Sequence, residues 1–151
     1  MDKYFIFLDI DGVLNSIGTN ILDDTYIKRL SLIQKEFNSE IILISTWCEL
    51  WEINDLKAVE MRELLTQKLK DYNMFISSFC YDSSAKRGTS IFNFLEKYKE
   101  YKIHYLILDD WIYEDYIGNM KDHQILTSFF DSKNGGIKES DIKKAINILK
   151  N

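Results

Sequence analysis

Short apolar runs alternate with segments of helical periodicity along this chain, and this alternation restricts the fold more than any other feature. The run at residues 4–8 is uninterrupted and rich in aromatic residues, which is typical of a strand buried on both faces of a parallel sheet. Similar runs follow at residues 41–44, 74–79, 105–108 and 124–127. We therefore predict about five strands.

Between these runs, apolar residues recur with the spacing of one helix face. Strands that alternate with helices form parallel sheets with right-handed crossovers. The predicted fold is therefore α/β, a doubly wound (Rossmann-like) parallel sheet with helices on both faces. The residues that mark the four helix faces are Tyr26, Ile27, Leu30, Ile33 and Phe37; Leu56, Val59, Leu64, Leu65 and Leu69; Ile91, Phe92, Leu95 and Tyr98; and Ile142, Ala145, Ile146 and Leu149.

Length and composition indicate one domain, residues 1–151, because 151 residues with 46% hydrophobic content suit a single core. The net charge of −5 disfavours a high-affinity, sequence-indifferent nucleic-acid binder, since an acidic surface repels phosphates. Cys48 and Cys80 form no C-x-x-C pair, and Asp9 and Asp11 interrupt the N-terminal apolar run. We expect a cytoplasmic protein with no membrane segment and no obligate protein partner.

Polar residues follow the predicted strands where a doubly wound sheet binds its ligands, at the carboxyl ends. The first strand is followed by Asp9 and Asp11, with Gly12 next. Alternate residues of a strand point the same way, so the two carboxylates are expected to share a site, and Gly12 permits a sharp turn after them. Buried acids are costly without a metal or a partner.

The other strand ends supply a hydroxyl, a cation and two more acids. Ser45 follows the second strand, where it suits either a phosphate contact or a helix N-cap. Lys86 and Arg87 precede a predicted helix, and Asp109 and Asp110 follow the fourth strand. Hard carboxylate oxygens are suitable ligands for Mg²⁺. Acids, hydroxyl, cation and acids in this order predict a metal-assisted phosphate site.

Residues 7–14 (FLDIDGVL) resemble the first motif of the haloacid dehalogenase (HAD) superfamily of phosphohydrolases. Ser45 is similar to the hydroxyl of the second motif and Lys86 to the lysine of the third, with Arg87 as the alternative. Asp109-Asp110 resembles the acidic fourth motif. The resemblance covers nearly the whole chain.

Finer details resemble the HAD domain of Swiss-army-knife RNA-repair-type proteins. In that branch a Trp follows the hydroxyl of the second motif, as in residues 45–47 (STW). The C-terminal part is also similar, with residues 123–127 (HQILT) and a helix led by Gly136. The branch has an Arg after the Trp, whereas this chain has Cys48.

The resemblance implies a phosphomonoester hydrolase in which Asp9 attacks phosphorus and forms an aspartyl-phosphate. Asp11 would protonate the leaving oxygen and then deprotonate water. Mg²⁺ would be held by the Asp9 side chain, the Asp11 backbone carbonyl and one or both of Asp109 and Asp110. Ser45 and Lys86 would bind the transferring oxygens. The implied substrate contacts are Gly12, Thr46, Trp47 and Arg87.

The segment after the first motif is too short for a folded cap domain, and the longer stretch from Trp47 to Tyr81 has the pattern of mostly one helix and a core strand. We therefore expect a capless enzyme with an open site. An open site suits the phosphate of a nucleic-acid end, and a small nucleotide fits as well. Two alternatives remain: a receiver-like, phospho-accepting signalling domain and a catalytically inactive HAD-like binding module. In a receiver the first acids are adjacent, whereas Ile10 separates them here.

Overall fold

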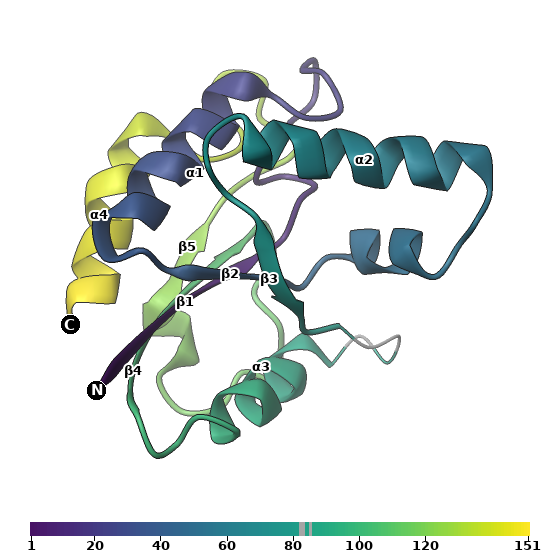
Figure 1. Cartoon of the computed structure of the whole chain (residues 1–151). Helices are drawn as coiled ribbons and strands as arrows, with labels where there is room; N and C mark the ends of the chain where they lie inside the picture. The colour runs from purple at the N-terminus through teal and green to yellow at the C-terminus, as the bar shows by residue number, and fades with distance from the viewer. Residues whose placement is uncertain (82–83, 85) are drawn as a thin grey trace.

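A computed structural model shows a five-stranded sheet flanked by helices (Figure 1). The structure describes residues 1–81, 84 and 86–151. All paired strands are parallel, in the order β3-β2-β1-β4-β5. The strands are β1 (Asp2–Leu8), β2 (Glu40–Leu43), β3 (Ile76–Phe79), β4 (Lys102–Asp109) and β5 (Gln124–Leu126). The helices are α1 (Asp24–Phe37), α2 (Leu56–Lys70), α3 (Arg87–Glu96) and α4 (Glu139–Lys150), with 3₁₀-helices η1 (Thr46–Trp51) and η2 (Met120–His123).

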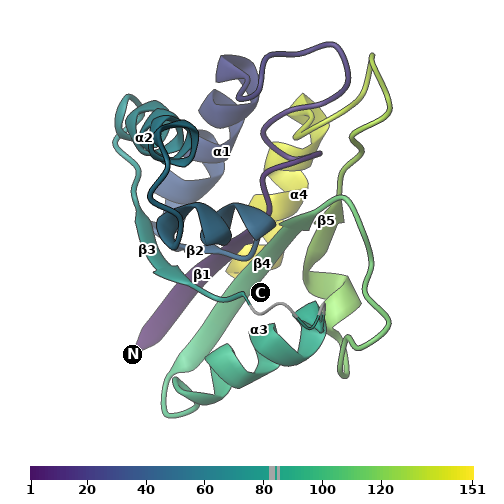
Figure 2. The same cartoon turned by 90° about the vertical axis from the view of Figure 1, so that its right-hand side faces the viewer.

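Helices cover both faces of the sheet, which confirms the predicted α/β architecture. Helices α1, α2 and α4 lie on one face and α3 on the other (Figure 2). In β1 the side chains alternate between these layers: Ile6 and Leu8 join the core beneath α1 and α4, whereas Phe5 and Phe7 join the core beneath α3. Burial on both faces explains why this strand is continuously apolar.

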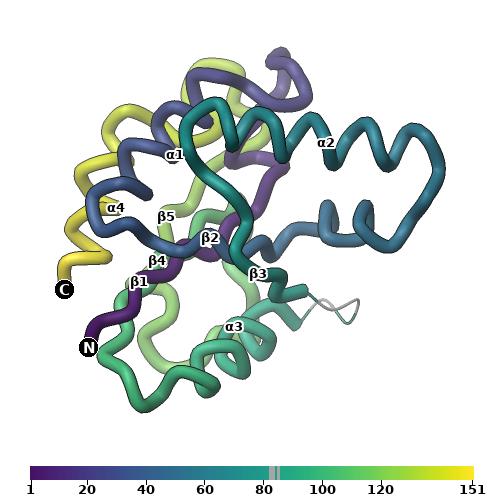
Figure 3. Tube along the Cα trace, in the orientation of Figure 1, coloured from purple at the N-terminus to yellow at the C-terminus, as the bar shows by residue number. Residues whose placement is uncertain are grey.

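The sequence pattern misplaced part of two helix faces. In α3, Phe94 is buried and Phe92 is 39% exposed. In α2, Leu56 is 74% exposed and Leu64 is 38% exposed, although both were predicted to face the core. The first half of α2 extends beyond the sheet together with η1, so much of this helix has no strand beneath it (Figure 3).

The connections that follow β1 and β2 contain no separate cap domain. Between β1 and α1 the chain forms no helix or strand, and between β2 and β3 it forms only η1 and α2. The capless form is thus confirmed for these two insertion points. Among the described residues, none of the helices has the length and apolar character needed to cross a membrane.

Candidate metal and phosphate site

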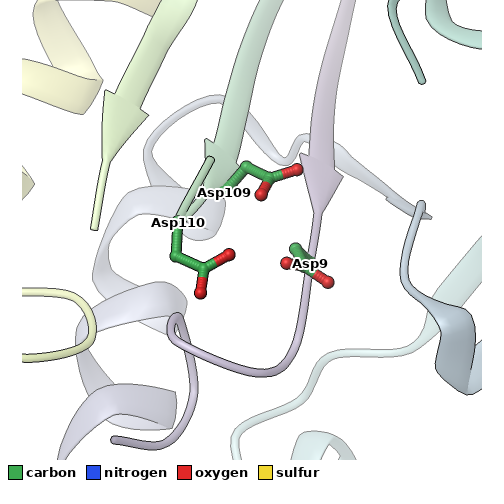
Figure 4. A group of neighbouring side chains, drawn as sticks. All are labelled: Asp9, Asp109 and Asp110. Carbon is green, nitrogen blue, oxygen red and sulfur yellow. The ribbon is translucent and has the colours of Figure 1, made fainter. Parts of the chain in front are cut away.

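The acids that follow β1 and β4 lie together at the carboxyl edge of the sheet. The two strands are paired in register to Leu8 and Leu108, and the Asp9 N–H donates to the Leu108 carbonyl at 2.9 Å. Asp9, Asp109 and Asp110 each place a carboxylate oxygen within 4.8 Å of the others. Figure 4 shows the three side chains converging on one space.

Arg87 is a cation that contacts two of these three acids, Asp9 and Asp109. Its Nη1 lies 2.6 Å from Asp109 Oδ2 and 3.6 Å from Asp9 Oδ2. Asp109 is fully buried and Asp9 is 8% exposed. The guanidinium also lies over the Tyr113 ring, 4.7 Å from its centroid. One cation faces three carboxylates, so the group has an excess of buried negative charge.

Burial and the neighbouring charge of Asp109 together raise the pKa of Asp9 to about 8, against the opposing effect of Arg87. Burial and the charge of Asp109 likewise raise the pKa of Asp110 to about 6. Protons bound to these acids would therefore relieve the repulsion between them. A divalent cation with a preference for oxygen ligands would do the same, so the donor set fits Mg²⁺.

Gly12 permits close contact between the loop after β1 and the acids after β4. Its φ is +84°, and an added Cβ would lie 2.7 Å from the Cβ of Asp110. Its N–H donates to Asn15 Oδ1 at 2.9 Å. The observed role of Gly12 is thus this backbone turn and the space it leaves for Asp110.

The carboxylate of Asp11 lies outside the group of three acids. Its Oδ1 accepts a hydrogen bond from Asn15 Nδ2 at 2.9 Å, and its Oδ2 accepts one from Trp47 Nε1 at 3.2 Å. Trp47 is only 6% exposed. The side chains of Asp9 and Asp11 therefore have different partners, although only one residue separates them.

The other predicted residues differ in their placement. Ser45 is 1% exposed and is the N-cap of η1, since its Oγ accepts from the Trp47 N–H at 3.1 Å. Thr46 is exposed. Lys86 is also exposed, and its ammonium forms no ion pair or hydrogen bond with the described residues. Of the two adjacent cations, Arg87 reaches the carboxylates.

Three residues at the site had no signal in the sequence: Asn15, Tyr113 and Asp115. Asn15 contacts the acid loop through both ends of its amide. Asp115 accepts hydrogen bonds from the first turn of α3, which holds Arg87. Each contact depends on how loops pack, and a local pattern does not predict such packing.

A family model matches most of the chain. The model of the HAD domain in Swiss Army Knife RNA repair proteins matches residues 5–134. This span includes the carboxyl ends of all five strands and the start of α3. No curated protein and no solved structure gives a significant match.

Proposed function

Because this chain belongs to the family of HAD domains found in Swiss Army Knife RNA repair proteins, we propose that it is a Mg²⁺-dependent phosphomonoester hydrolase with Asp9 as nucleophile. The observation that supports this most is the buried group of Asp9, Asp109 and Asp110 around Arg87. HAD domains are usually phosphohydrolases.

In the proposed reaction, Asp9 forms a bond to phosphorus and the bond to the leaving oxygen breaks. Asp11 donates its proton to that oxygen. Water then attacks the aspartyl-phosphate, Asp11 takes a proton from the water, and the bond between Asp9 and phosphorus breaks to release inorganic phosphate. One oxygen of Asp9, Oδ1, accepts a hydrogen bond from the Ile10 N–H at 2.9 Å, which orients the carboxylate for attack through Oδ2.

Asp9, Asp110 and the backbone carbonyl of Asp11 would hold Mg²⁺. Both oxygens of Asp109 already have donors, because Oδ2 pairs with Arg87 at 2.6 Å and Oδ1 accepts from the Trp111 N–H at 3.1 Å. These donors leave lone pairs open on Asp109, but the short ion pair holds it against Arg87, and it is fully buried, whereas Asp110 is only half-buried. On this ground we assign direct ligation to Asp110 and assign Asp109 to the support of Arg87. When bound, the cation would offset the repulsion between Asp9 and the phosphate dianion.

Arg87 and Ser45 are proposed to bind the transferring phosphoryl oxygens. Arg87 has a planar set of donors that suits phosphate, and it already lies beside the nucleophile. The Ser45 oxygen accepts a hydrogen bond from the backbone, but its own hydrogen remains able to donate. Lys86 and Thr46 are exposed, which suits contacts with the rest of a bulky substrate.

The proposed substrate is a phosphate on a nucleotide or at the end of a nucleic acid. The family supports this choice, and so do the connections after β1 and β2, whose described residues form no cap domain. The net charge of −5 favours contacts with a few phosphates over a long footprint. Cys48 and Cys80 form no C-x-x-C pair, which suits the reducing cytoplasm, where we propose that the reaction takes place.

The test compares wild type with Asp9→Asn in the presence of Mg²⁺. The panel contains phosphorylated metabolites and RNA and DNA oligonucleotides with a 3′- or 5′-phosphate. We expect phosphate release from at least one class by the wild type and almost none by Asp9→Asn. Asp122→Asn is the matched control, since Asp122 is an exposed aspartate on η2. Undiminished turnover by Asp9→Asn would refute the proposal.

Other outcomes identify the alternatives. A single round of phosphorylation at Asp9 without sustained phosphate release would indicate a receiver-like signalling domain. Absence of Mg²⁺ binding by titration calorimetry, together with absence of turnover, would indicate an inactive binding module.

A further inference from the structure

The indole of Trp47 joins the carboxyl ends of two neighbouring strands. Trp47 lies in η1 directly after β2, and its Nε1–H donates across to Asp11 Oδ2, beyond the end of β1, at 3.2 Å. The ring is buried in the core shared with Leu8, Ile10 and Leu65. A buried indole requires an acceptor for its N–H, and the acceptor here is the proposed acid/base of the reaction.

The rest of the surroundings restrict both partners. Ser45 Oγ accepts the Trp47 backbone N–H at 3.1 Å, which holds the start of η1 against the end of β2. On the other side, Asn15 Nδ2 donates to Asp11 Oδ1 at 2.9 Å and also to the Ile21 carbonyl at 2.8 Å. Asn15 is 4% exposed. Each oxygen of Asp11 therefore has one donor fixed by the fold.

Two donors do not saturate this carboxylate. An ionised carboxylate has about four lone-pair sites, so about two remain for a leaving oxygen or a water. Asp11 itself is exposed, whereas both donors are buried. The donors thus define the plane of the carboxylate and leave its open side to solvent and substrate.

We propose that Trp47 is a positioning residue that holds Asp11 in the orientation for proton transfer, instead of a residue that contacts substrate. This inference rests on the proposed function. Its physical basis is that proton transfer requires the acid within hydrogen-bond reach of the leaving oxygen, and a small displacement of a catalytic group has a large effect on rate. The N–H of Trp47 matters for this role, while the ring fills the core.

The test is a double-mutant cycle with Trp47→Phe and Asp11→Asn, because Phe keeps an aromatic ring in the core but lacks the N–H. Rates are measured on an alkyl phosphate, whose leaving oxygen needs a proton, and on p-nitrophenyl phosphate, whose leaving group does not. We expect Trp47→Phe to lower kcat on the alkyl phosphate by roughly tenfold, as for one hydrogen bond to a charged group, with little change in KM. The decrease in kcat caused by Trp47→Phe should be smaller on the aryl phosphate. When Asp11 is already Asn, Trp47→Phe should cause almost no further decrease in kcat.

Trp51→Phe is the matched control. Trp51 lies on the same 3₁₀-helix, and its ring centroid is 5.1 Å from that of Phe79. Trp51→Phe therefore removes an indole from η1 without removing a donor to Asp11. Replacement of Trp47 by its benzothienyl analogue, in which sulfur takes the place of the N–H, keeps the ring shape. If Trp47→Phe unfolds, the analogue provides the same comparison.

Two results would overturn the inference in an active enzyme. One is an equal loss of kcat from Trp47→Phe with and without the Asp11 carboxylate. The other is a rise in KM at unchanged kcat, which would make Trp47 a substrate contact. Absence of turnover by the wild type on every substrate would instead refute the proposed function, and this inference with it.

Discussion

The carboxylate of Asp115 accepts hydrogen bonds from both the backbone N–H and the hydroxyl of Thr89, at 2.7 and 2.9 Å. A third hydrogen bond comes from the Gly88 N–H at 3.1 Å. Partial burial acts to raise the pKa of Asp115, but the hydrogen bonds from Thr89 outweigh it and lower the pKa below its usual value. Asp115 thus fastens the first turn of α3, and with it Arg87, to the loop after β4.

Asp115→Ala should destabilise the protein and lower its activity. The loss of a side chain that satisfies helix N-terminal N–H groups costs about 1 kcal/mol of unfolding free energy. Arg87 should then be held less firmly, so kcat should fall more than the loss of stability explains. Urea denaturation and phosphate release measure the two effects. Glu114→Ala, at the exposed neighbouring position, should change neither.

Gly12→Ala should weaken Mg²⁺ binding and destabilise the fold. The positive φ alone costs a residue with a Cβ about 1–2 kcal/mol, and the new methyl group would also displace Asp110. Gly18→Ala is the control, because Gly18 has a φ of +86° with open space around its Cβ position. Equal effects of the two substitutions on Mg²⁺ affinity would contradict the close contact between Gly12 and Asp110.

Arg87→Ala should cost far more stability at neutral pH than Lys86→Ala. Removal of one partner from a buried ion pair leaves an uncompensated charge, with a typical cost of about 3–5 kcal/mol. Lys86 is exposed, and a surface substitution of this kind usually changes stability by less than about 0.5 kcal/mol. Chemical denaturation of both variants measures the difference. Similar losses would mean that Arg87 does not compensate the acids.

The metal-free protein should lose stability as the pH rises from about 4 to about 8. Burial raises the pKa of Asp9 from 3.8 to about 8, so between these values the folded state binds more protons than the unfolded chain does. Stability falls with pH wherever the folded state binds more protons. Chemical denaturation in the presence of a chelator, at several pH values, measures the free energy of unfolding. A free energy of unfolding that rises from about pH 4 to about pH 8 would contradict this prediction.

For the same reason, Mg²⁺ affinity should increase with pH between about 6 and 8. The cation must displace the protons that burial retains on Asp110 and Asp9, whose pKa values are raised to about 6 and about 8. Calorimetric titrations in two buffers of different ionisation enthalpy would show proton release. Saturating Mg²⁺ should also remove the pH dependence of stability. A Mg²⁺ affinity that does not change with pH would contradict the expected rise in affinity and the expected proton release.

The position of the acids could be predicted because it follows from local pattern and sheet topology. The apolar runs predicted the ends of the strands to within about three residues, and parallel strands end at one edge. Asp9, Asp109 and Asp110 lie at that edge as expected. The sequence left open whether Ser45 contacts phosphate or caps a helix, and the structure shows that Ser45 is the N-cap of the 3₁₀-helix η1.

Tertiary packing alone decided which cation faces the acids and where Asp11 points. Lys86 and Arg87 are adjacent, and the rotation of α3, set by the contact of Gly88 and Thr89 with Asp115, brings Arg87 to Asp109. Asp11 has partners that Asp9 lacks, since Asn15 and Trp47, which is 36 positions further along the chain, donate to its carboxylate.

By itself, the sequence determined the order of strands and helices and the strand ends at which carboxylates are placed, because periodic burial and a polar residue after a strand are local properties of the chain. The contacts that orient Arg87 and Asp11 join residues far apart in sequence. Their geometry depends on how whole elements dock, and only the tertiary structure contains that information.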